Sequence, residues 1–128
     1  MLTESEITDR FRPKGTKRGE ELFLSLSHAV ALLELCDRNS IAIIGIEGFF
    51  LRDGDLHPRL DEIADYSSAV ADAWDSFVRI CNDSAQAFLQ SLCSDSEVVS
   101  ESEVVVTVTT LSQANWRERS ERGSERDQ

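Results

Sequence analysis

The run IAIIGIEGFFL at residues 41–51 decides the fold class of this chain. It is nearly unbroken in apolar character and rich in β-branched and aromatic residues, which is typical of a central strand covered on both faces. The Asp53–Gly54 pair that follows indicates a two-residue hairpin turn. Residues 56–60 then return as a short strand, and Pro58 places that strand at an edge of the sheet because proline cannot donate to the ladder.

Apolar periodicity predicts a helix before this hairpin. Apolar residues recur at helical spacing over residues 22–33, so we place the helix at about residues 19–37. Glu20 and Glu21 fall near its start, where acidic side chains suit the positive end of the helix dipole.

A second helix and a last strand are predicted after the hairpin. Apolar residues keep helical spacing over 70–92, and the short polar residues 82–84 are expected to kink or divide that helix. The stretch Glu103–Leu111 is rich in valine and threonine and predicts a strand, which the second helix brings back beside residues 41–51. The prediction is an α+β domain in which two amphipathic helices pack on a small, mostly antiparallel sheet, in the order α-β-β-α-β.

The chain is expected to form one domain with two loose ends. Residues 1–18 mix helix breakers with like charges and are predicted to be a flexible basic arm. Residues 19–111 form the single acidic α+β domain. Residues 112–128 alternate arginine, glutamate and serine and are predicted to be a disordered or frayed charged tail.

The charge of the chain is concentrated in the domain. Residues 20–111 hold 17 acidic residues and four arginines, a net charge of −13, whereas the whole chain carries −11. Binding nucleic acid by neutralising phosphates needs a basic face, and an anionic membrane surface also needs one, so neither is an expected partner. An acidic domain suits a basic protein partner, whose approach its field would accelerate.

The composition favours a cytoplasmic protein. There is no apolar run of membrane-spanning length, and the first residues lack the charged and apolar regions of a signal peptide. The cysteines at 36, 81 and 93 are odd in number and match no metal spacing, so we expect small buried side chains in a reducing compartment.

The sequence contains no sign of catalysis. His28 and His57 lie far apart, no serine is marked as activated, and the Gly45–Gly48 segment lacks the pattern of a phosphate-binding loop. We therefore predict no catalytic residue, no metal ligand, no cofactor and no enzymatic activity.

Acidic residues around one aromatic side chain form the candidate interface. Acids can match lysine and arginine on a partner while the aromatic supplies buried contact area. Trp74 shares the apolar stripe of the second helix and is expected in the core, which leaves Tyr66 as the exposed aromatic. The predicted contact residues are Glu47, Asp53, Asp55, Asp61, Glu62, Asp65 and Tyr66.

Five short segments share their pattern with a known family: IAIIGIEGF at 41–49, DGD at 53–55, LDEIADYS at 60–67, WDSFV at 74–78 and SAQAFL at 84–89. In these segments the chain resembles the small bacterial immunity proteins that are encoded beside polymorphic or contact-dependent toxins. The resemblance covers about residues 25–92. It implies a cytosolic, non-enzymatic protein that binds one cognate toxin domain, often a nuclease, and it carries over no individual contact residue.

The expected function is therefore direct, stoichiometric neutralisation of a toxin domain with a basic surface. One alternative is an acidic secretion chaperone, which binds an effector segment as a dimer. A second alternative is a small hydrolase or nucleotide-binding enzyme, which needs a pocket with converging polar groups. The sequence leaves the oligomeric state open.

Overall fold

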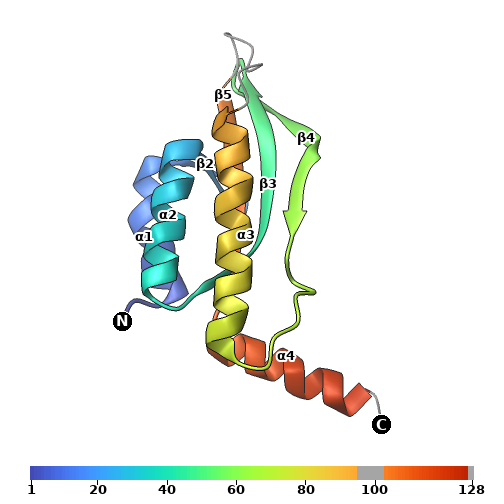
Figure 1. Cartoon of the computed structure of the whole chain (residues 1–128). Helices are drawn as coiled ribbons and strands as arrows, with labels where there is room; N and C mark the ends of the chain where they lie inside the picture. Colours follow the sequence, from blue (N-terminus) through green and yellow to red (C-terminus); the bar gives the residue numbers. More distant parts are fainter. Residues whose placement is uncertain (95–102, 127–128) are drawn as a thin grey trace.

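A five-stranded antiparallel sheet with helices α2 and α3 on one face forms the centre of the computed structural model, which describes residues 1–94 and 103–126 (Figure 1). The strand order is β1-β2-β5-β3-β4, and each neighbouring pair is antiparallel. The elements are α1 (Glu4–Phe11), η1 (Arg12–Lys14), β1 (Thr16–Arg18), β2 (Glu21–Ser25), α2 (Leu26–Arg38), β3 (Ala42–Arg52), β4 (Asp55–Asp65), α3 (Trp74–Ser94), β5 (Glu103–Leu111) and α4 (Gln113–Arg126).

The predicted fold class is confirmed. The elements α2, β3, β4, α3 and β5 follow one another in the predicted order, and β5 has the predicted bounds. Helix α3 is the crossover that returns β5 to the side of β3, where Ile46 pairs with Val108 and Gly48 with Val106. The shared core contains Ile46 and Val106 from the sheet and Leu33 and Leu89 from α2 and α3. The two layers are held together by this apolar burial.

The prediction of a flexible arm at residues 1–18 is wrong. Thr3 caps α1 and forms a capping box with Glu6, in which each side chain accepts the backbone N–H of the other residue. Ile7 and Phe11 are only 1% and 4% exposed and lie in the core beside α2. A capped helix that buries two large side chains is an integral part of the domain.

The first predicted helix begins later than expected. Ser25 is the N-cap of α2, and its hydroxyl accepts the backbone N–H of His28. The residues before it form β2, in which Phe23 and Leu24 are both buried on opposite faces of the sheet. Phe23 meets Phe49 edge-on at 5.1 Å between ring centroids. Glu20 and Glu21 therefore lie in a hairpin and its strand, not at a helix start.

The β3–β4 hairpin confirms the predicted turn. Asp53 and Gly54 have φ values of 53° and 82°, and Arg52 pairs with Asp55 across them, as a two-residue turn with positive φ at both central positions requires. Strand β4 lies at one edge of the described sheet, as Pro58 predicted, but it continues to residue 65, beyond the short strand predicted at residues 56–60.

Helix α3 begins at Trp74 and continues through Asn82 without a break, so the predicted division is absent. Asn82 is 3% exposed, and its side chain bonds the start of β3 instead of competing with its own helix. The backbone N–H of Ile43 donates to its Oδ1 at 2.8 Å, and its Nδ2 donates to the carbonyl of Ile41 at 3.1 Å. Val70, assigned to the helix by its spacing, precedes it and is 88% exposed.

The charged tail is helical in the structure. Trp116 of α4 packs on Trp74 and Phe77 of α3 with ring centroids 5.6 and 5.7 Å apart, and Trp74 is in the core as predicted. Helix α4 then extends from the end of the domain (Figure 1). Serine and acidic residues dominate residues 94–102, which predicts a loop there; this segment lies outside the described residues, apart from Ser94 at the end of α3.

Candidate partner-binding site

One face of the sheet carries Glu47 and Asp65. Side chains directly opposite each other on paired antiparallel strands share a face. Glu47 lies opposite Ile63 and Thr107, and Gly45 lies opposite Asp65. Ile46, which lies between Gly45 and Glu47 in β3, points to the opposite face of the sheet and into the core under α2 and α3. We call the face with Glu47 and Asp65 the open face. On it Glu47 is exposed and Ile63 is 51% exposed.

The structure separates the predicted contact residues into two groups. Asp65 pairs with Gly45 near one end of β3, whereas Asp55 pairs with Arg52 at the other end. The seven residue steps from Gly45 to Arg52 span roughly 23 Å at about 3.3 Å per residue, so Asp55 and Asp65 lie at opposite ends of the hairpin. The backbone of Asp61 and Glu62 belongs to β4, but their side chains lie outside the described residues. No single compact acidic patch joins all the described members.

Tyr66 is a structural residue, contrary to its predicted exposure. Its ring is half-buried and packs against the shared core and against the neighbouring cluster that contains Trp74 and Phe77. Its hydroxyl donates to the carbonyl of Ser84 in α3 at 3.1 Å. Burial raises the pKa of the Tyr66 phenol, and nearby Cys81 adds to the effect. Tyr66 thus fastens the end of β4 to α3.

Asp65 is exposed but is held in place locally. The backbone N–H of Ser67 donates to its Oδ1 at 2.9 Å. Hydrogen bonds from the Ser67 hydroxyl and backbone lower the pKa of the Asp65 carboxyl, and the positive charge of Arg119 in α4 adds to this. The carboxylate therefore stays ionised and fixed in direction on the open face.

A second acidic site lies where β2 separates from β5. Strand β2 pairs with β5 only at its last two residues, Leu24 with Val106 and Ser25 with Val105. Its first three residues, 21–23, pair with β1 instead. In the described part of the chain, residues 107–110 of β5 are therefore paired with β3 alone. We call the space between β2 and residues 107–110 the acid-lined gap.

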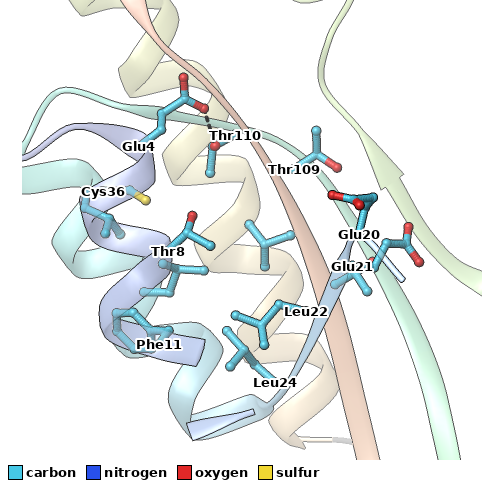
Figure 2. Close-up of a pocket in the computed structure, with 14 residues that line it drawn as sticks. Glu4, Thr8, Phe11, Glu20, Glu21, Leu22, Leu24, Cys36, Thr109 and Thr110 are labelled. Carbon is cyan, nitrogen blue, oxygen red and sulfur yellow. Dashed lines mark hydrogen bonds between the residues drawn. The ribbon is translucent and has the colours of Figure 1, made fainter. Parts of the chain in front are cut away.

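The acid-lined gap has an apolar floor and a negative rim. It encloses about 350 Å³, with Ile7 and Phe11 of α1 among its apolar lining. Glu4, Glu20 and Glu21 also line it, and none of its described lining residues is basic. Figure 2 shows Glu20 and Glu21 on one side of β5 and Glu4 on the other.

Threonine hydroxyls line the β5 side of the gap. Thr110 donates its hydroxyl to Glu4, which links β5 to α1 (Figure 2). Thr107 is only 8% exposed, and within the described residues its hydroxyl has no hydrogen-bond partner. A buried hydroxyl without a partner is uncommon and indicates a place where a further polar group is accommodated.

Sequence reasoning missed the acid-lined gap because it assigned Glu20 and Glu21 to the start of a helix and Glu4 to a loose arm. A usable signal was present. Thr3 and Glu6 have the spacing of a capping box, which would have predicted α1. No sequence pattern predicts that β2 and β5 pair through only two residues, because this pairing depends on how two distant segments are placed in the folded chain.

The described residues offer no reactive thiol or metal site in the interior. Burial raises the pKa of Cys36 to about 12 and that of Cys81 to about 11, so both stay protonated, as small buried side chains do. Cys93 is exposed, contrary to the prediction. No group of three or more histidine, cysteine or acidic side chains in the described ranges is placed to hold a metal ion.

Ser25 and His28 are placed like a catalytic serine–histidine pair, but their contacts indicate a structural role. The Ser25 hydroxyl lies 3.2 Å from Nδ1 of His28, but it also accepts the backbone N–H that begins α2. Among the described residues, no acidic side chain hydrogen-bonds His28 to orient it, as a triad would require. Ser25 therefore acts as the N-cap of α2, and His28 donates the backbone N–H that it accepts.

Comparison with protein-family models, curated proteins and solved structures finds no match to this chain. Among the described helices, none is both long and apolar enough to cross a membrane.

Proposed function

We propose that this chain is a cytoplasmic immunity protein, which binds a cognate toxin domain with a basic surface and neutralises it by direct, stoichiometric contact. One observation carries the proposal. Glu20, Glu21 and Glu47 are exposed acids with no ion-pair partner within 4 Å in the described part of the chain, and they lie beside exposed or half-buried apolar groups. Unpaired acids of this kind leave their charge available to a partner.

The charge fits an inhibitor of a nuclease. A nuclease must hold phosphates, so its active site is basic, and an acidic inhibitor can occupy that site or bind beside it. Complementary charge accelerates capture, which matters when few toxin molecules are lethal. Tight binding also needs a desolvated apolar centre, and Ile63 beside Glu47 on the open face is suited to that role.

The proposed interface is narrower than the one predicted from sequence. Glu47 and Asp65 are retained because they share the open face, and Asp53 and Asp55 are retained as a separate contact at the hairpin tip. Asp61 and Glu62 stay predictions. Tyr66 is left out because its half-buried ring packs against the core and its hydroxyl is bonded to α3.

The test begins with co-expression of the tagged chain and the product of the adjacent upstream gene. A one-to-one complex with one folded domain, together with loss of that domain's toxicity, is the expected result. Charge reversal by Glu47→Lys with Asp65→Lys should slow association about tenfold at low salt and reduce its salt dependence. The matched control, Glu34→Lys with Asp72→Lys, makes the same change in net charge at exposed positions that are not part of the proposed interface.

Two outcomes would overturn the proposal. Recovery of a stable dimer of this chain on an unfolded segment of a large secreted protein would establish the chaperone alternative. A complex whose association rate is reduced equally by both double variants would show that overall charge, and not the open face, drives binding.

A further inference from the structure

We infer that the acid-lined gap receives an extended basic segment of the partner, which adds to β5 as an extra strand. The identity of the partner rests on the proposed function, but the site itself does not. The inference joins three independent features: a stretch of β5 unpaired on one side, a pocket beside it, and acidic residues on the rim.

The main chain of β5 supplies the first part of the recognition. In an antiparallel strand, each residue turns both its N–H and its C=O toward one neighbouring strand, and the next residue turns them toward the other. Two of the four residues in 107–110 therefore face the gap, where β2 has already left the sheet. Such groups are a template for a further strand.

The space beside β5 suits a short strand. Adjacent strands lie about 4.8 Å apart, and four residues of strand run for about 13 Å. The gap has a volume of about 350 Å³ and extends from Glu20 and Glu21, at the start of β2, to Glu4 at the start of α1. It is continuous with the sheet at the pair Leu24–Val106, so an added strand would begin where β2 ends its pairing.

The two sides of the gap differ in chemistry. Figure 2 shows Glu20, Glu21 and Thr109 on one side of β5, and Phe11, Leu22 and Leu24 on the other. Successive side chains of an added strand point to opposite faces. The preferred segment therefore alternates lysine or arginine with apolar residues. The buried Thr107 hydroxyl, which has no partner in the described structure, offers a further hydrogen bond at this edge.

The probes are three synthetic peptides of eight residues, tested against the whole chain by amide hydrogen exchange in NMR. The first alternates valine and lysine, the second alternates valine and glutamate, and the third is the lysine peptide N-methylated at alternate residues on its pairing edge. The lysine peptide should slow exchange at least about tenfold at two of the four amides in residues 107–110. The glutamate and N-methylated peptides should leave exchange unchanged.

Matched variants separate local from overall charge. Glu20→Lys with Glu21→Lys should weaken the lysine peptide about tenfold or more, while Glu34→Lys with Asp72→Lys should change its affinity less than about threefold. All four side chains are exposed, so neither variant should disturb folding. Equal weakening by both variants, or equal binding of the N-methylated peptide, would overturn strand addition.

The remaining outcomes distinguish this inference from the proposed function. If the chain captures and neutralises a folded toxin domain but no amide in 107–110 gains protection, strand addition is wrong and the proposed function stands. If the lysine peptide protects these amides but no toxin is bound, the site stands and the proposed function fails. If the free chain dimerises with these amides already protected, the occupant of the gap is a second copy and the inference is wrong.

Discussion

The α2–α3 surface and the acid-lined gap are both acidic, but their charges are used differently. At the α2–α3 surface, Arg79 pairs with Asp37 at 3.3 Å and with Asp83 at 3.0 Å. Asp37 also accepts a hydrogen bond from Nδ2 of buried Asn82 at 3.0 Å. At the gap, Glu20 and Glu21 have no partner within the described residues.

This difference teaches that acidic composition alone does not identify an interface. A carboxylate that is paired and tied to a buried amide supports the fold, because removing it leaves other polar groups without partners. An exposed carboxylate without a partner contributes little to stability, so its charge is available for binding. The identity of a residue as aspartate or glutamate does not tell which of these two roles it has.

The largest expected effect on stability comes from removing the buried Asn82 side chain beneath the α2–α3 surface. Asn82→Ala removes the side chain that accepts from Ile43 and donates to Ile41 and Asp37. We expect a loss of about 2–3 kcal/mol in the free energy of unfolding, because buried backbone groups are left unsatisfied. Urea denaturation measures it, and Gln86→Ala, at an exposed position of the same helix, is the control. A loss below about 1 kcal/mol would contradict the assigned role of Asn82.

Truncating a paired acid should lower the free energy of unfolding more than truncating an unpaired acid. Asp37→Ala should lower the free energy of unfolding by about 1 kcal/mol, since it removes an acceptor of Asn82 and a partner of Arg79. Glu21→Ala should change it by less than about 0.5 kcal/mol. Paired thermal and urea denaturation curves measure both changes. Equal effects would remove the distinction between the two surfaces.

Tyr66 sharpens the comparison, because it was predicted as a contact residue and its half-buried ring packs against the core of the domain. Tyr66→Phe keeps the ring and removes the hydrogen bond to the Ser84 carbonyl, so it should cost about 0.5–1 kcal/mol of stability. It should leave the rate and affinity of toxin binding unchanged. A variant that retains full stability but loses binding would return Tyr66 to the interface.

The smallest expected effect is a pH dependence at Asp65. The pKa of its carboxyl is lowered in the folded state, so its stabilising contribution is complete above the unfolded pKa of about 3.9 and is lost as pH falls through the lower, folded value. NMR should show Asp65 titrating below 3.9. The melting temperatures of the wild type and Asp65→Asn should differ by a constant amount above about pH 5 and converge in more acidic solution. A titration midpoint above 4 would contradict the Ser67 hydrogen bonds and the effect of the Arg119 charge.

Sequence patterns succeeded where local and tertiary preferences agree. The run of valine and threonine at 103–111 is a strand with the predicted bounds, and the Asp53–Gly54 pair adopts the predicted turn. In both places the backbone preference of the residues is the same as the conformation that the sheet imposes. The crossover by α3 followed from chain topology.

Predictions failed where one pattern fitted two structures. Leu22, Phe23 and Leu26 have helical spacing, yet Phe23 and Leu24 point to opposite faces of a strand, because β1 and β5 pair with that segment and Ser25 caps the helix after it. Asn82 was expected to weaken its helix, and instead its amide meets the backbone of β3. Both results depend on partners far away along the chain.

The sequence by itself determined the α+β class, the order of the central elements, and the excess of negative charge in residues 20–111. These properties depend on composition and on short-range periodicity. Tertiary structure alone decided which acids are paired, how far Asp55 lies from Asp65, and that β2 leaves β5 after two residue pairs. Strand pairing is a long-range interaction, and the register of distant strands decides which side chains share a face.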